Sequence, residues 1–374
     1  MENAEWTYNK GEWSEAYTLT KLLGDGKVHA ADENLNKIEE EFYPILKILK
    51  EEIEKQFIIN NDMNIIEISD LKGNLFKTID IKEFIKISNI TLKKIKEGKG
   101  NTFSIPLLEN FIKGMEIKQF KSSSRRKSDM IMEIKDLKTN ISKEFSFSIK
   151  SELGNKPTIL NASKATNFIF KIEGIHDYEV EEIMQINKET DKKWLKLRIG
   201  KILEFVKRKK YKLTFFQTEN QQFSTNLKLI DSNLPLIVSE ILLFFYSNEK
   251  ITDITSLTEY IVESNPLNLS NNEKELFYKT NMIELIKSST FGMMPTKKWE
   301  KEYDVNGGIL TVRNDGEIVC HHIFYNKKQL DEYLFNNTKL ETASTKRYQT
   351  GEIYKINENE NEFYFKLNLQ IRMN

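Results

Sequence analysis

The change from helical spacing to strict alternation near residue 130 constrains the fold more than any other feature. Residues 130–135 alternate, and residues 144–150 alternate again, as in strands with at least one buried face. The polar stretch 136–143 lies between them and is typical of a hairpin connection. In the second run, the apolar side chains share one face: Phe145, Phe147 and Ile149. The sequence therefore predicts two antiparallel strands joined by a polar turn.

Helical spacing predicts a helix over about residues 11–23. Asn9 and Glu12 have the spacing of a capping box, and Tyr8 and Trp13 have that of a hydrophobic staple. Further helices are predicted by spacing alone at 35–54, 162–171 and 192–207.

The C-terminal part of the chain is predicted to be rich in strands. Residues 314–316 (Asn-Asp-Gly) suit a hairpin turn between strands over 308–312 and 317–324, and residues 362–372 alternate. This order of elements predicts an α/β fold, with α+β as the alternative, in two lobes. We place the lobes at residues 1–180, which include the candidate site, and at residues 181–374.

Composition excludes several classes of protein. A lone cysteine, Cys320, forms no internal disulfide, which excludes a disulfide-stapled secreted scaffold. The most apolar stretch, residues 234–246, is shorter than the roughly 20 residues of a spanning helix, and no secretory signal is visible at Met1. We expect a cytoplasmic protein with no membrane association. Four histidines and one cysteine without ligand spacing give no support to a zinc site.

Charge is balanced, with 56 basic and 56 acidic residues, so binding of nucleic acid would depend on local patches. One basic cluster, at residues 121–127, includes Arg125, Arg126 and Lys127 and leads directly to Asp129. A second spans residues 207–212. Such runs are more often solvated, but the first lies where a phosphate would have to dock if Asp129 holds a metal.

Asp129 and Lys150 are the residues most suited to chemistry. Asp129 immediately precedes the first predicted strand and Lys150 ends the second, so a hairpin brings them close together. A carboxylate can hold a divalent ion that polarises a phosphate, and an ammonium can orient water and offset developing charge. Asp and Lys are common, however, so the same pattern also fits two solvated strand ends.

The position two residues before Lys150 is Ser148, which cannot be an anionic ligand. A second metal-binding carboxylate would then come from elsewhere, and Glu15 is our candidate. It shares a helical stripe with Leu19 and Leu22, which aims it along the buried side. A surface glutamate on a first helical turn fits the pattern as well.

Two C-terminal segments could contact bases. The last predicted strand places four polar side chains on one face: Lys366, Asn368, Gln370 and Arg372. Residues of these types can bind guanine or adenine in the major groove, although a polar strand face is usually only exposed. The preceding loop, residues 342–348, includes Lys346 and Arg347 and is a comparable candidate.

Several segments in order along the chain resemble the HpaII-type family of type II restriction endonucleases. They are residues 10–17 (KGEWSEAY), 30–37 (AADENLNK), 147–151 (FSIKS), 160–163 (LNAS), 165–168 (ATNF), 336–339 (NNTK), 342–345 (TAST) and 365–372 (FKLNLQIR). The resemblance implies a PD-(D/E)xK-type mixed sheet flanked by helices, with a second C-terminal α+β lobe. It also implies a Mg²⁺ requirement and cleavage of a short DNA palindrome, CCGG in the founding member.

Carried over to this chain, the resemblance implies that Asp129 is the metal-binding aspartate and Lys150 the superfamily lysine. Ser148 departs from the acidic residue of the superfamily. Asn161 and Asn167, inside the matching segments, become candidate DNA contacts. Hydrolysis would leave a 5′-phosphate and a 3′-hydroxyl.

The partner implied is double-stranded DNA, and a palindromic site favours a homodimer, although a monomer could nick each strand in turn. A cognate DNA methyltransferase is expected in the same system, but not as a stable subunit. The alternative function is a sequence-specific DNA-binding protein that has lost catalysis, which the serine at position 148 suggests.

Overall fold

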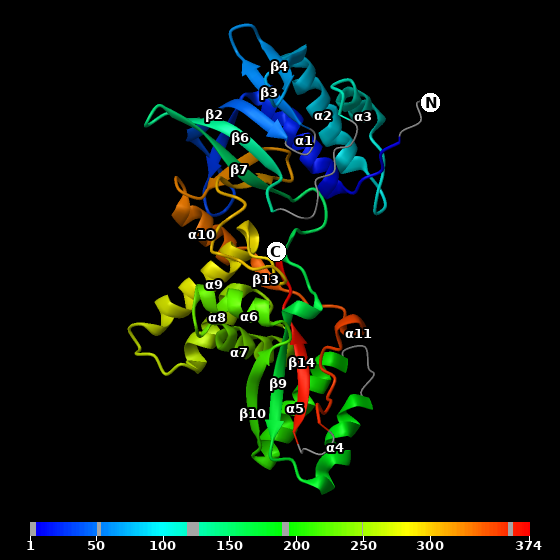
Figure 1. Ribbon diagram of the computed structural model, residues 1–374, viewed down its shortest axis with the longest axis vertical. Coiled ribbons are helices and arrows are strands. Elements are labelled where there is room, and N and C mark those ends of the chain that lie inside the picture. The colour runs from blue at the N-terminus through cyan, green and yellow to red at the C-terminus, as the bar shows by residue number, and fades with distance from the viewer. Residues whose placement is uncertain (1–4, 51–53, 118–126, 189–193, 249, 358–361) are drawn as a thin grey trace. The chain divides into compact units, whose positions relative to one another are not determined.

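A computed structural model describes residues 5–50, 54–117, 127–188, 194–248, 250–357 and 362–374 (Figure 1). The chain divides into two compact units. Unit 1 comprises Met1–Pro157 and Tyr303–Tyr333, and unit 2 comprises Thr158–Glu302 and Leu334–Asn374. The division expected after residue 180 therefore differs from the observed one, because the chain leaves unit 1 earlier and later returns to it.

Unit 1 is built on a nine-stranded sheet in the order β1-β12-β11-β7-β6-β2-β3-β4-β5. Its strands are β1 (Lys27–Ala31), β2 (Lys37–Lys50), β3 (Lys55–Asn60), β4 (Ile65–Asp70), β5 (Leu75–Asp80), β6 (Met130–Asp136), β7 (Ile141–Ser151), β11 (Gly308–Val312) and β12 (Ile318–His322). Because β1 also pairs with β2, the six strands from β1 through β2 in this order close into a ring. The expectation of mixed helices and strands is confirmed, but the sheet is a closed ring with a three-stranded extension.

The predicted hairpin is confirmed as β6 and β7, whose register pairs Met130 with Phe147. The strands are longer than predicted, because the exposed residues 141–144 continue β7 beyond the buried core. Asp136 closes the turn by accepting hydrogen bonds from the Lys138 amide (2.9 Å) and the Thr139 hydroxyl (2.6 Å). On its other edge β7 pairs in parallel with β11. Phe147, on the apolar face of β7, is fully buried.

The first predicted helix is confirmed as α1 (Lys10–Asp25). Asn9 and Glu12 form the capping box, and the rings of Tyr8 and Trp13 lie 5.0 Å apart. The helix ends at Gly26, whose φ of 65° suits glycine. α1 packs on the apolar face of β7, and its Ser14 hydroxyl lies 2.8 Å from that of Ser151.

The helix predicted over residues 35–54 is wrong, since residues 37–50 form the long strand β2. Its apolar residues fit either period locally. The first half of β2 pairs with β1, and the second half pairs with β3 and β6 on its two sides. These pairings satisfy the backbone hydrogen-bonding groups along most of the strand. In a helix, Pro44 would lack the backbone N–H that donates the intrahelical hydrogen bond.

The helix predicted over residues 162–171 is also wrong. A short 3-10 turn at Lys164–Thr166 leads into strand β9 (Asn167–Glu173). The run is rich in aromatic and β-branched residues, and it is paired on both sides in a buried sheet, an environment that favours a strand. The helix predicted at 192–207 is confirmed as α5 (Trp194–Lys209).

The remaining helices of unit 1 are α2 (Ile81–Glu97) and α3 (Pro106–Lys113). α2 begins at the N-cap Asp80 and packs along α1. The hairpin turn at residues 314–316 is confirmed between β11 and β12, with Gly316 at a φ of 100°. A short helix, α10 (Lys327–Asn336), follows, and its residue Tyr333 stacks on His321 of β12 with ring centroids 4.5 Å apart.

Unit 2 contains two three-stranded sheets, β10-β9-β14 and β13-β15-β8. Their remaining strands are β8 (Thr158–Leu160), β10 (Lys212–Thr218), β13 (Thr338–Leu340), β14 (Phe363–Asn368) and β15 (Ile371–Met373). The single C-terminal strand predicted over 362–372 is thus two strands in different sheets. The helices besides α5 are α4 (Val180–Gln185), α6 (Gln221–Ile230), α7 (Leu234–Ser247), α8 (Ile254–Ser264), α9 (Lys274–Phe291) and α11 (Thr345–Tyr348).

The apolar stretch 234–246 forms α7 and is largely buried in unit 2, as predicted for a core segment. Within the described ranges, no single helix has the length and apolar composition to cross a membrane. α6 and α7 reach that composition only as a pair, and they are bent by 107° at the break between them.

Candidate active site

The carboxylate of Asp129 is held by the strand opposite it. Its Oδ2 accepts a hydrogen bond from the Ile149 amide at 2.7 Å and one from the Ser148 hydroxyl at 3.2 Å. The Asp129 amide donates to the carbonyl of Phe147 at 2.9 Å, so the residue continues the β6–β7 ladder by one position. Asp129 therefore lies opposite Ser148, on the same face of the sheet.

Lys150 lies on the same face of β7 as Ser148, two residues further on, and is half-buried. Its register partner on β11 is Thr311. The structure therefore places the two predicted residues, Asp129 and Lys150, on one face of the hairpin, at the same end of the paired strands.

Lys127 brings a second ammonium group to this neighbourhood. Burial, and after it the positive charge of Lys150, lower the pKa of Lys127 to about 8. The negative charges of Asp129 and Asp304 act on Lys127 in the opposite direction. Two ammonium groups and two carboxylates thus lie within electrostatic reach of one another, an arrangement suited to a polyanionic substrate that carries a metal ion.

Ser148 is almost fully buried, with 1% of its surface exposed, and its hydroxyl bonds Asp129. It fixes the carboxylate of its neighbour and supplies no negative charge of its own.

Glu15 lies half-buried on α1, which covers the face of β7 that carries Phe147 and Ile149. Its neighbour Ser14 contacts Ser151 at the end of β7, on the face opposite to that of Lys150. The role of Glu15 as a metal ligand stays a prediction.

A cavity of about 440 Å³ opens beside Asp129. Its polar lining comes from Ser128, Asp129, Glu144, Ser146, Asp304 and Asn306. The last two belong to the segment with which the chain returns to unit 1, more than 150 residues after Ser146. Sequence reasoning missed Asp304 and Asn306, because no local motif marks them.

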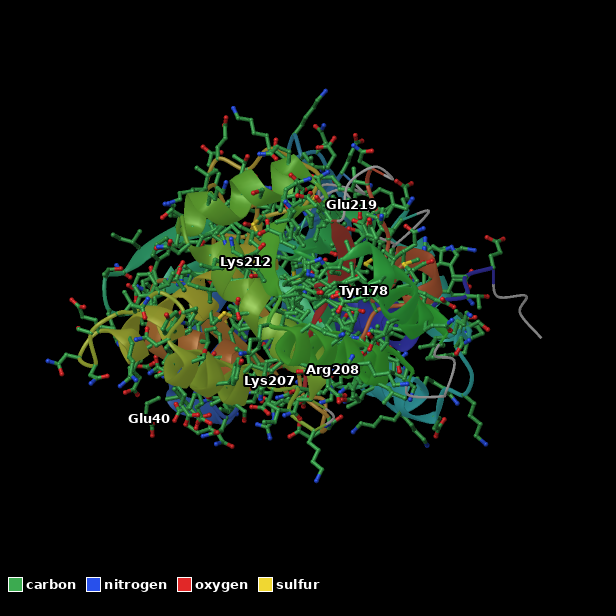
Figure 2. All side chains as sticks on the ribbon, turned by 90° about the horizontal axis from the view of Figure 1, so that it is seen from below. Glu40, Tyr178, Lys207, Arg208, Lys212 and Glu219 are labelled. Carbon is green, nitrogen blue, oxygen red and sulfur yellow. The ribbon has the colours of Figure 1, made fainter. Side chains whose placement is uncertain are left out.

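The first basic cluster is described only in part. Lys127 lies at the site, whereas Arg125 and Arg126 lie outside the described residues. The second cluster, at residues 207–212, ends α5 and begins β10, and Figure 2 labels Lys207, Arg208 and Lys212 there. Arg208 pairs with Glu182, and Lys209 with Glu179 at 2.7 Å. This cluster is therefore largely balanced by acidic partners.

Two of the predicted DNA contacts are interior residues of unit 2. Asn167 and Asn368 have 1% and 0% of their surface exposed. The Asn368 amide donates to Asn167 Oδ1 at 2.6 Å and to the Ser163 carbonyl at 2.7 Å. These contacts give both residues a structural role, so we do not include them in a DNA-binding surface.

The other predicted contacts of unit 2 differ in exposure. Lys366 pairs with Glu219 at 3.0 Å, and Arg372 pairs with Glu341 at 3.1 Å. Gln370 is half-buried in the break between β14 and β15. Arg347 and Asn161 are exposed, and the side chain of Lys346 lies outside the described part of the structure.

The chemistry of the site fits a hard divalent cation better than zinc. Across the described ranges, no group of three or more His, Cys, Asp or Glu side chains is arranged to hold a metal. Mg²⁺ needs no such group, since one or two carboxylates, waters and substrate phosphates usually complete its shell. Asp129 and Asp304 both line the cavity, which matches that preference.

The comparison with known proteins decides the family. A family model described as HpaII restriction endonuclease matches residues 9–373. The chain belongs to the HpaII restriction endonuclease family. The type II restriction enzyme HpaII of Haemophilus parainfluenzae is 39% identical over 368 residues, which are 97% of this chain and 98% of that relative.

The resemblance seen in the sequence is thereby confirmed, and so is the expectation of an enzyme that acts on DNA. No solved structure matches the chain significantly. Within this HpaII-family chain, the roles of individual residues consequently rest on the geometry of the site described above.

Proposed function

We propose that this restriction endonuclease cuts double-stranded DNA at a short palindrome by Mg²⁺-dependent hydrolysis, and that Asp129 and Lys150 form its catalytic centre. The observation that supports the proposal is the Asp129 carboxylate, fixed by Ser148 and Ile149 on the face that also carries Lys150. A PD-(D/E)xK centre also requires an aspartate before one strand and a lysine on the antiparallel neighbour of that strand. We therefore propose that the β6–β7 hairpin carries a centre of this superfamily.

Asp129 would hold the metal ion, since its Oδ2 is oriented by two donors from β7. When bound, Mg²⁺ would polarise the scissile phosphate and lower the pKa of a nearby water. Lys150 would orient the attacking water and stabilise the negative charge that develops on the phosphate. Lys127, next to both, would attract the DNA backbone.

In-line attack on the phosphorus would leave a 5′-phosphate and a 3′-hydroxyl. We propose CCGG as the first candidate site, as the family resemblance implies. A palindrome has two-fold symmetry, so a homodimer that presents two copies of the site is the favoured assembly. A cognate methyltransferase in the same system and a cytoplasmic location, where the DNA lies, stay predictions.

We propose that exposed residues outside the hairpin recognise the DNA sequence. Arg347 and Asn161 are exposed in unit 2 and are the strongest remaining candidates. Arg125 and Arg126 stay predictions as phosphate contacts, together with Lys346.

The test is digestion of a fully sequenced, unmethylated plasmid in Mg²⁺, followed by run-off sequencing of the ends. We expect discrete fragments whose ends share one palindrome, and ligation of those ends without prior phosphorylation would show the 5′-phosphate. The same digestion in EDTA should leave the plasmid intact. A smear in place of discrete fragments, or cutting in EDTA, would contradict the proposal.

A further inference from the structure

Asp304 lies at the start of the segment that returns to unit 1, and it lines the cavity beside Asp129. Nothing in its local sequence marks it, because it is distant along the chain from both strands of the hairpin.

The loop that carries Asp304 is fastened to β7 at Ser146. The Ser146 hydroxyl donates to the Asp304 carbonyl at 2.8 Å, and the Ser146 amide donates to Asn306 Oδ1 at 2.8 Å. In return, the Asn306 amide donates to the Ser146 hydroxyl at 3.0 Å, and the Gly307 amide donates to the Ser146 carbonyl at 2.7 Å. Because Ser146 precedes Lys150 by four residues, the loop is fixed relative to the catalytic strand.

The carboxylate itself lies beside the backbone of Lys127. Asp304 Oδ2 lies 3.4 Å from the amide nitrogen of Lys127, two residues before Asp129. The ammonium of Lys127 feels the charge of both carboxylates. Asp304 is exposed, so a phosphate or a cation can reach its oxygen atoms from the cavity.

The site needs such a group, because Ser148 provides no second negative charge. Glu144 also lines the cavity, but it is already paired with Lys47 at 2.7 Å. Of the carboxylates that line this cavity, Asp304 has the contacts that tie it to both Lys127 and the catalytic strand.

We propose that Asp304 supplies the second carboxylate that holds the divalent cation together with Asp129. This inference rests on the proposed function of Asp129 and Lys150. The returning segment Tyr303–Tyr333 then contributes directly to the reaction. Asp304 has the role of metal ligand that an acidic residue at position 148 would otherwise have.

The experiment compares Asp304→Asn with Asp129→Asn, Glu15→Gln and the control Glu302→Gln. The asparagine at 304 keeps the shape and an acceptor for the Lys127 amide, so its unfolding curve should superimpose on that of the wild type. Glu302 is exposed, two residues before Asp304, and does not line the cavity. Two properties are measured: Mn²⁺ binding by electron paramagnetic resonance, without DNA, and cleavage of plasmid DNA in Mg²⁺.

We expect Asp304→Asn and Asp129→Asn each to weaken Mn²⁺ binding by about tenfold or more and to slow cleavage by about 100-fold or more. Glu302→Gln should change neither property. Normal Mn²⁺ binding by Asp304→Asn, with Asp129→Asn defective, would overturn this inference alone, whether or not cleavage slows. Loss of Mn²⁺ binding in Glu15→Gln but not in Asp304→Asn would also overturn it. Normal binding and cleavage by Asp129→Asn would overturn the proposed function as well.

Discussion

The amide of Ile149 donates a 2.7 Å hydrogen bond to the carboxylate of Asp129. A main-chain donor on β7 thus fixes the acidic side chain that precedes β6. Ser148 and Lys150, which flank this donor residue, lie on the same face of the sheet as Asp129. Strand pairing thus sets the position of both proposed catalytic residues, and the two hydrogen bonds from β7 orient the Asp129 carboxylate.

Lys150→Ala should abolish cutting while leaving DNA binding largely intact. In the proposed mechanism the ammonium stabilises the charge that develops during the reaction, so its loss should slow cleavage by at least about 100-fold. Gel-shift and cleavage assays on the same duplex measure the two effects separately. The control is Lys138→Ala, which removes an exposed lysine from the tip of the same hairpin. Equal cleavage by the two variants would contradict the role of Lys150.

Ser148→Ala should reduce stability by about 1 kcal/mol, since one hydrogen bond to Asp129 is lost while the Ile149 amide remains. Ser148→Asp should be less stable than Ser148→Ala without metal, because two carboxylates would then lie side by side. Added Mg²⁺ should stabilise Ser148→Asp more than it stabilises the wild type. Urea unfolding with and without Mg²⁺ measures both quantities, and equal stabilisation of the two proteins would argue against a cation at this position.

Acid should destabilise unit 1 through its buried histidines. Burial lowers the pKa of His321 and of His322 to about 4. The unfolded chain therefore binds more protons than the folded one between pH 6.5 and pH 4, and stability falls as the pH decreases through that window. The loss is on the order of 3 kcal/mol per histidine.

His322→Phe is the variant that tests this effect, because the new ring keeps the aromatic contact with Tyr325 and removes the titrating group. It should unfold more easily than the wild type at pH 7 but lose less stability on going to pH 5. Denaturant unfolding at the two pH values gives the difference. A pH dependence identical to that of the wild type would show that folding does not change the pKa of His322.

Asn368→Ala should destabilise unit 2 by about 2 kcal/mol, because it leaves the buried Asn167 Oδ1 and Ser163 carbonyl without the donor that they now share. Discrimination between cognate and altered DNA sites should not change. Unfolding curves and competition gel shifts test the two statements, with Arg347→Ala as the comparison, for which we expect the opposite result. A loss of discrimination in Asn368→Ala, with unchanged stability, would restore it as a base contact.

Local sequence was sufficient for elements whose determinants are neighbours in the chain. The capping box of Asn9 and Glu12 and the hairpin of β6 and β7 are set by residues a few positions apart. It was not sufficient for β2 and β9, because their periodicity is ambiguous and pairing with strands distant in sequence decides it.

The same distinction applies to the candidate site. Asp129, Ser148 and Lys150 lie on one hairpin. Alternation predicts the common face of Ser148 and Lys150, and the hairpin predicts that Asp129 lies near Lys150. Asp304 reaches the cavity through parallel pairing of β11 with β7. A single sequence does not indicate that β7 pairs in parallel with β11, because the residues of unit 2 separate the two strands along the chain.

The order of synthesis determines when the ring and the cavity are complete. β11, β12 and the Asp304 wall of the cavity are translated only after residues 1–157 of unit 1 and residues 158–302 of unit 2. A ribosome that stalls earlier releases a product with an open ring and an unfinished pocket. A chain that ends before Tyr303 would therefore lack two of the six strands of the ring and one wall of the cavity.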